Sequence, residues 1–207
     1  SVWVDCTSGV PDSAQKLAVQ LAKHGVIFLD APVSGQTVGA ENGTLTVMVG
    51  GNAEGYEKAL PAMQAFGKLI KHVGESGAGF AVKAVNNMLM AVNLCAVAEG
   101  FTTLKAHGVN LHEALDCINA SSGKSMVTET VLPQRILNRS FPVTFALPLL
   151  AKDTGIAIDL AREAKISAPV LSLTQNLIQA ASDLSDKNSD FSSAVKMYES
   201  WSNITIE

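Results

Sequence analysis

Apolar and polar residues follow one rhythm in the first third of this chain and a different rhythm afterwards. In the first part, short apolar runs bounded by glycine or proline predict strands, and apolar residues three and four apart predict helices between them. Strands that alternate with helices favour a parallel or mixed sheet with helices on its faces. The predicted strands cover residues 2–5, 26–29, 44–49 and 68–72, and the predicted helices cover residues 11–24 and 53–66.

A long stretch without proline, residues 79–107, follows the glycines at 74, 77 and 79. Small and straight-chain residues dominate it, so we predict one helix about 43 Å long at 1.5 Å per residue. Apolar residues surround the predicted helix nearly completely, which indicates burial against several neighbours. Lys83, Asn93 and Glu99 make it too polar for a membrane span, so we expect no membrane partner.

No strand pattern follows the long helix, and the remaining predicted elements are all helices. We therefore expect an α/β part, residues 1–76, followed by an all-helical part, residues 77–207. The helical part carries alanine, leucine and valine on more than one face, which favours a homodimer or homotetramer, to be checked by sedimentation at micromolar concentration. The further predicted helices cover residues 110–120, 127–138, 147–164, 169–184 and 190–201.

Composition excludes several classes of function. Hydrophobic residues make up 47% of the chain and charged residues 16%, which is enough apolar material for a large core. A net charge of −4 argues against a nucleic-acid partner. Cys6, Cys95 and Cys117 are scattered, which indicates buried thiols in a reducing compartment, the cytoplasm or alternatively the mitochondrion. The four histidines form no metal-type pair, so we predict no metal site.

Lys83 and Asn87 form the first candidate site. Residues four apart on a helix share one face, one turn apart. Burial lowers the pKa of a lysine amine toward the range that a general acid/base needs, and a neighbouring carboxamide could hold a substrate hydroxyl. The ordinary alternative is a solvated surface lysine, and spacing alone does not decide between them.

Two other patterns carry candidate chemistry. The sequence DAPVSG, residues 30–35, follows a predicted strand, and open α/β sheets bind ligands beyond the carboxyl ends of their strands. Ser34 and Gly35 could donate hydrogen bonds to an anion there, whereas the structural alternative is a surface turn. Lys152 and Asp153 follow an apolar run, which is equally typical of a helix that meets solvent.

In this order, the motifs resemble the β-hydroxyacid dehydrogenase family, and within it the 3-hydroxyisobutyrate dehydrogenases and tartronate-semialdehyde reductases. The resemblance covers the whole chain. It is carried by DCTSGVP at 5–11, DAPVSG at 30–35, the glycines, lysine and asparagines of 77–87, SSG at 121–123, the run 145–153, and DFS at 190–192.

The resemblance implies the later part of an NAD(P)-binding Rossmann domain, followed by an all-helical substrate and dimerisation domain. It implies reversible hydride transfer between NAD or NADP and a small 3-hydroxy carboxylate, or reduction of the matching semialdehyde. The implied roles are Lys83 as general acid/base, Ser34, Gly35, Gln36, Asn87 and Asp153 around the substrate, and Ser8, Phe145 and Lys152 against the cofactor.

The sequence departs from the family pattern in three respects. Gln36 stands where the family usually has a second glycine, so the loop that binds the substrate carboxylate has an altered preference. Met126 stands where relatives often carry tryptophan. The G-x-G-x-x-G phosphate-binding fingerprint does not occur. We therefore expect the amino-terminal part of the dinucleotide domain to be missing and this chain alone to be inactive.

Two other functions stay open. Enzymes like 6-phosphogluconate dehydrogenase generally carry a histidine beside the asparagine after the lysine, and Val85, Asn86 and Asn87 offer none. A non-catalytic binding or assembly module of the same fold is the other alternative. The joint presence of Lys83, Asn87 and Lys152 argues against such a module, and fluorescence of a bound reduced nicotinamide cofactor separates the two.

Overall fold

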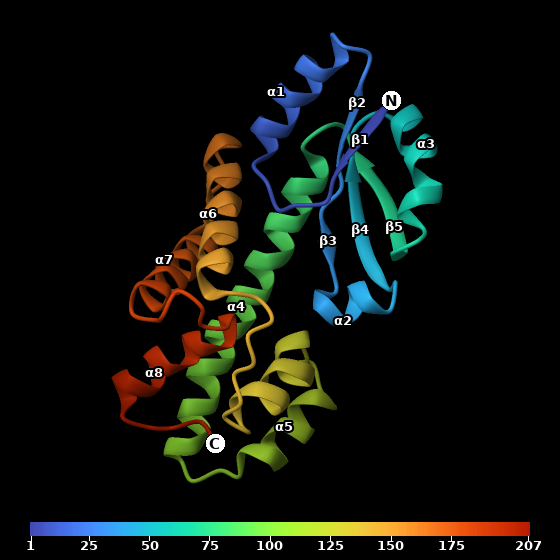
Figure 1. The fold of residues 1–207 in the computed structure, drawn as a ribbon. Coiled ribbons are helices and arrows are strands. Elements are labelled where there is room, and N and C mark those ends of the chain that lie inside the picture. The colour runs from blue at the N-terminus through green and yellow to red at the C-terminus, as the bar shows by residue number, and fades with distance from the viewer. The chain divides into compact units, whose positions relative to one another are not determined.

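A computed structural model describes all residues, 1–207. The chain forms two compact units, Ser1–Asn86 and Asn87–Glu207. Helix α4, Ala78–Ala106, begins in the first unit and continues into the second (Figure 1). The predicted domain boundary at residue 76 precedes this helix, and that assignment of domains stays a prediction.

The first unit is built on a five-stranded mixed sheet. Strands β1 and β2 pair in parallel, as do β4 and β5, whereas β4 runs antiparallel to β2 and β3. This agrees with the predicted parallel or mixed sheet. The strands are β1 Val2–Asp5, β2 Ile27–Asp30, β3 Val33–Ser34, β4 Leu45–Gly50 and β5 Gly67–Gly74.

Helices α1, Pro11–Ala22, and α3, Ala53–Met63, cover opposite faces of the sheet (Figure 1). Successive side chains of a strand point to opposite faces. Phe28 accordingly packs in a cluster with α1, and Leu29 packs in a cluster with α3. Both helices end earlier than predicted: α1 ends before Gly25, whose φ of +69° turns the chain away.

Two elements of this unit were missed and predicted as loop. Strand β3 is two residues long, and helix α2, Gln36–Glu41, has six residues. Elements this short contain too few residues to show a periodic pattern of apolar positions, so they become visible only through their contacts in the fold. Strand β3 pairs with β4, Val33 opposite Val47, which fixes the chain just before Gly35.

The second unit is all-helical around one core, as predicted. Its only extended pairing is an isolated bridge between Ala146 and Asp190. Leu94 of α4, Leu132, Leu150 and Phe191 are fully buried in that core. The elements after α4 are α5 Leu111–Asn119, the π-helix η1 Val127–Ile136, α6 Leu147–Glu163, α7 Pro169–Asp183, the 3₁₀ helix η2 Phe191–Ala194 and α8 Val195–Ser202.

The start of α5 agrees with its sequence signal, whereas two other predicted helices differ in type from the prediction. The Asn110 side chain accepts hydrogen bonds from two backbone N–H groups and caps α5 as predicted. The predicted ordinary helix at 127–138 is instead a π-helix with Pro133 inside it. The predicted single helix at 190–201 is divided into η2 and α8, with the Asp190 side chain accepting from the N–H of Ser192.

Two expectations about burial were wrong. Helix α4 is not enclosed on every side, because Val82, Val85 and Leu89 are 40%, 44% and 54% exposed. The prediction that this helix is too polar for a membrane span was also wrong, because α4 is long and apolar enough to cross one, a test that buried core helices also pass. Of the three free thiols only that of Cys95 is buried, whereas Cys6 and Cys117 are exposed.

Candidate functional site

Three segments of the first unit converge at the carboxyl edge of β1 and β2. Asp5 and Asp30 lie opposite each other at the ends of these parallel strands, so the chain leaves both strands at one edge. The loop after β1 packs on the start of α4: a Cβ atom on Gly9 would lie 2.4 Å from the Phe80 ring. Ser8, predicted to contact the cofactor, lies half-buried in this loop.

Asp30 joins the second segment to the third. Its carboxylate is fully buried, and its two oxygens accept hydrogen bonds from the backbone N–H groups of Gly77 (2.7 Å) and Phe80 (3.0 Å). Burial raises the pKa of Asp30, and the backbone N–H groups of Gly77 and Phe80 act in the opposite direction. Sequence reasoning gave Asp30 no role, although an acidic residue directly after an apolar strand was a usable signal.

Lys83 and the DAPVSG segment are thus anchored at one point. Lys83 is half-buried on α4, three residues after Phe80. Ser34 ends β3 opposite Thr46, four residues after Asp30. Gly35 has a φ of +136°, which residues with a side chain rarely adopt. The predicted general acid/base and the predicted carboxylate-binding loop therefore both extend from the Asp30 anchor.

Gln36 departs from ordinary backbone geometry as well as from the family pattern. Its φ is +59°, in the left-handed region that favours glycine. The side chain is exposed at the start of α2. The chain therefore keeps a glutamine where glycine would relieve backbone strain, directly after the predicted carboxylate-binding residues.

In the second unit, three of the predicted residues form one cluster. The Asn87 side-chain amide donates to the Asp153 carboxylate at 2.6 Å, and both side chains are buried. The Lys152 amine lies 3.2 Å from the other Asp153 oxygen. Phe145 makes its contacts elsewhere: its ring lies 6.0 Å from that of Phe191, and its carbonyl accepts from the Phe191 N–H.

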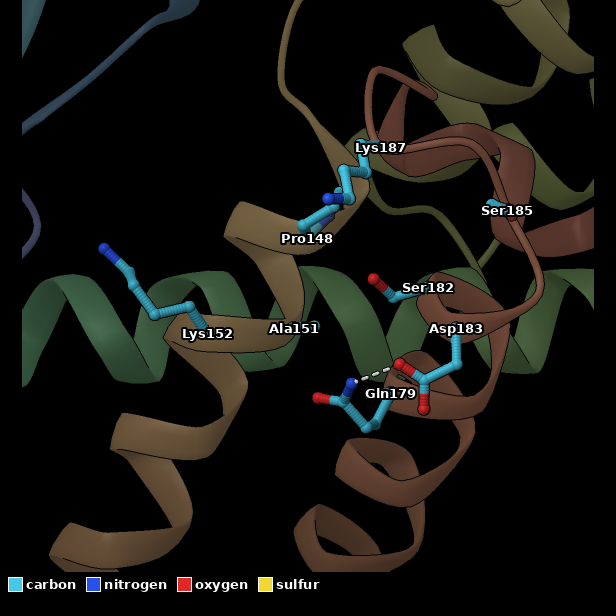
Figure 2. Close-up of a pocket in the computed structure, with 8 residues that line it drawn as sticks. All are labelled: Pro148, Ala151, Lys152, Gln179, Ser182, Asp183, Ser185 and Lys187. Atoms are coloured by element: carbon cyan, nitrogen blue, oxygen red, sulfur yellow. Dashed lines mark hydrogen bonds between the residues drawn. The ribbon is translucent and has the colours of Figure 1, made fainter.

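A pocket of about 600 Å³ opens beside Lys152, between the start of α6 and the end of α7 (Figure 2). Figure 2 shows Lys187 and Pro148 among the lining residues, and the Gln179 amide donates to the Asp183 carboxylate at 2.8 Å. Amines and hydroxyls of this kind suit an anionic group. The sequence did not reveal this pocket, which is lined by Pro148, Ala151, Lys152, Gln179, Ser182, Asp183, Ser185 and Lys187.

Comparison with known proteins identifies the family. Residues 1–74 match the NAD binding domain of 6-phosphogluconate dehydrogenase, and residues 77–198 match the NAD-binding domain of NADP-dependent 3-hydroxyisobutyrate dehydrogenase. The chain is 34% identical to 2-(hydroxymethyl)glutarate dehydrogenase of Eubacterium barkeri, over 100% of this chain and 68% of that protein. The chain belongs to the 3-hydroxyisobutyrate dehydrogenase family.

Other members agree with this assignment. The chain is 34% identical to 3-hydroxyisobutyrate dehydrogenase of Pseudomonas aeruginosa, over 94% of this chain and 68% of that protein. A structure of Mycobacterium tuberculosis 3-hydroxyisobutyrate dehydrogenase with L-serine, 29% identical, matches 95% of this chain and 69% of that chain with a TM-score of 0.87. The predicted oxidoreductase class, the Rossmann-plus-helical fold and the NAD or NADP cofactor are confirmed.

Proposed function

We propose that this dehydrogenase interconverts a small 3-hydroxy acid and its semialdehyde, with Lys83 as general acid/base. The observation that carries the proposal is the Asp30 anchor, which brings the helix of Lys83 and the segment of Ser34 to one edge of the sheet. That edge lies beyond the carboxyl ends of β1 and β2, where open α/β sheets bind their ligands.

The proton and the hydride follow separate routes. NAD or NADP, when bound, supplies the carbon that accepts or returns the hydride. During oxidation, the neutral Lys83 amine takes the proton of the substrate hydroxyl while the carbinol carbon loses its hydride. During reduction, the Lys83 ammonium returns a proton to the carbonyl oxygen. The protein therefore contributes position and proton transfer.

The other site residues hold the substrate. Ser34 and Gly35 donate hydrogen bonds to its carboxylate in this proposal, and Asn87 holds its hydroxyl. Asp153 accepts one N–H of the Asn87 amide, and that bond fixes the orientation of the amide. Since Asn87 follows Lys83 by four residues on α4, both side chains belong to one face of the helix.

The donor set of the second unit suits a dinucleotide cofactor. Lys152 and Lys187 line one pocket together with two serine residues, and amines and hydroxyls are the usual partners of phosphate oxygens. The pocket also holds the Asp183 carboxylate, which accepts a hydrogen bond from Gln179. We propose that Lys152 contacts the cofactor, and Ser8 stays a proposed cofactor contact by the family resemblance alone. Phe145 stays a predicted cofactor contact, with its backbone held against Phe191.

Titration of the full-length natural polypeptide with NADH and NADPH, followed by turnover assays, tests this function. We expect saturable fluorescence enhancement, and turnover of small 3-hydroxy acids. Turnover of 6-phosphogluconate alone would favour the sugar-phosphate alternative. Absence of both cofactor binding and turnover would favour a non-catalytic module.

Gln36 is proposed to set substrate preference. The substrates named for two relatives, 3-hydroxyisobutyrate and 2-(hydroxymethyl)glutarate, differ by a second carboxylate. An exposed side-chain amide beside Ser34 and Gly35 could donate to that group. We expect Gln36→Gly to lower kcat/KM for 2-(hydroxymethyl)glutarate relative to 3-hydroxyisobutyrate by about ten- to a hundredfold, the usual range for one hydrogen bond to a charged group.

The control for this prediction is Thr37→Ala, at the next exposed position of α2. It should leave the ratio of the two kcat/KM values unchanged. An unchanged ratio in Gln36→Gly as well would remove Gln36 from substrate recognition.

The homodimer or homotetramer stays a prediction, as does a cytoplasmic location. Val170 and Leu173 of α7 support an oligomer, because both are large apolar side chains that remain exposed.

A further inference from the structure

Asp30 is a buried charge held in an unusual way. Its side chain has no exposed surface, and the bonds that hold it come from backbone N–H groups rather than from a basic side chain. Burying a carboxylate is costly unless hydrogen bonds replace its water. Asp30 is a buried carboxylate at the start of the helix that carries Lys83, so Asp30 is a candidate for a role in the function of Lys83.

The two donors lie at the start of α4: Gly77 directly precedes the helix, and Phe80 is in its first turn. The first N–H groups of an α-helix have no partner within the helix, and the helix dipole favours a negative charge there. Gly77 and Phe80 contribute these N–H groups, and they lie 47 and 50 residues from Asp30 along the chain. A single carboxylate therefore fixes both the position and the direction in which α4 leaves the sheet.

The surrounding glycines make this approach possible. A Cβ atom on Gly79 would lie 2.3 Å from the Met48 carbonyl oxygen and 2.4 Å from that of Asp30. A Cβ atom on Gly50 would lie 2.6 Å from an Asp30 carboxylate oxygen. The backbone of α4 thus touches the ends of β2 and β4 directly, which leaves little room for the helix to shift.

We infer that Asp30 is a positioning residue for proton transfer. Its backbone leads within four residues to Ser34, and its side chain holds the turn that precedes Lys83. The carboxylate therefore ties the loop that would bind the substrate carboxylate to the amine that would move the proton. This inference rests on the proposed function of Lys83.

The test compares Asp30→Asn with wild type in the full-length enzyme. Asparagine keeps one acceptor and turns an N–H donor toward one of the helix N–H groups, so the first turn of α4 must move. A displacement of about 1 Å can lower turnover by about a hundredfold. We expect kcat to fall by about ten- to a hundredfold, with the dissociation constant for reduced cofactor changed by less than about twofold.

Two controls separate positioning from simple loss of stability. Met63→Ala opens a cavity in the core of the same unit and should lower the melting temperature while kcat stays within about twofold of wild type. Asp12→Asn removes an exposed carboxylate of α1 and should change neither quantity. Positioning predicts that Asp30→Asn loses far more kcat than Met63→Ala at equal loss of melting temperature.

If Asp30→Asn does not fold, Asp30→Ser, which has a smaller neutral acceptor, is used to distinguish a positioning role of Asp30 from a purely structural one. A folded Asp30 variant with normal kcat overturns the inference, and so does failure of both variants to fold, which would make Asp30 purely structural. Lys83→Ala is measured in parallel. If it is inactive while Asp30→Asn is normal, only the present inference fails, whereas an active Lys83→Ala rejects the proposed function itself.

Discussion

Replacement of Lys83 by alanine is expected to lower kcat by about 10²–10⁴-fold, the usual contribution of a general acid/base. The amine is the only group in this account that takes the hydroxyl proton during oxidation, and alanine cannot replace it. Lys83 is also half-buried rather than freely solvated, three residues after Phe80, whose N–H donates to Asp30. Initial rates in both reaction directions, at saturating cofactor, measure the loss.

Two variants serve as controls for this prediction. Lys83→Arg keeps the positive charge, but a guanidinium stays protonated, so it should be nearly as inactive as the alanine variant. Lys16→Ala removes an exposed lysine of α1 and should retain full activity. Near-normal turnover of Lys83→Ala would remove Lys83 from the mechanism while leaving the family assignment intact.

Asp190→Ala is expected to destabilise the helical unit by about 3–5 kcal/mol, the usual cost of removing one partner of a buried ion pair. Asp190 is buried, and both of its oxygens lie 3.2 Å from the same guanidinium nitrogen of the buried Arg135. It also accepts from the N–H groups of Thr144, Phe145 and Ser192, so one carboxylate joins three segments. Urea unfolding measures the change in free energy.

The same residue predicts a pH dependence. Burial raises the pKa of Asp190, but hydrogen bonds from Ser192, Thr144 and Phe145 outweigh it and hold the pKa below 3.8. Because the folded pKa is depressed, this stabilisation is present above pH 3.8 and is lost as the pH falls through the folded pKa. Wild type should therefore lose stability below pH 3.8 more steeply than Asp190→Ala.

Asp186→Ala is the matched control for both measurements, because Asp186 is exposed in the neighbouring loop. It should change the free energy of unfolding by less than about 0.5 kcal/mol. Equal stability of Asp190→Ala and wild type at neutral pH would contradict the role given to the buried pair.

Features that depend on local sequence were predictable. The glycines before residue 80 and the long run without proline located α4, and Asn110 located the start of α5. The family motifs also located the residues that the helical unit brings together, Asn87, Lys152 and Asp153. Their pairing was not predictable from spacing, because Asn87 and Asp153 lie 66 residues apart.

Features that depend on tertiary contacts were missed for the same reason. The roles of Asp30 and Asp190 arise from N–H groups that distant segments bring to them, and spacing along the chain does not show those partners. The π-helix at 127–136 was predicted as an ordinary helix, because residue types locate a helix without giving the spacing of its hydrogen bonds. Strand β3 exists only because β4 pairs with it.

The pH dependence of kcat/KM in wild type and Lys83→Ala shows whether the Lys83 amine transfers the proton. A base must be neutral for oxidation and an acid must be protonated for reduction. Wild type should therefore lose kcat/KM toward low pH in the oxidative direction and toward high pH in the reductive direction. Lys83→Ala should lose both of these dependences. The same dependences in the variant, at reduced or full activity, would mean that another group transfers the proton.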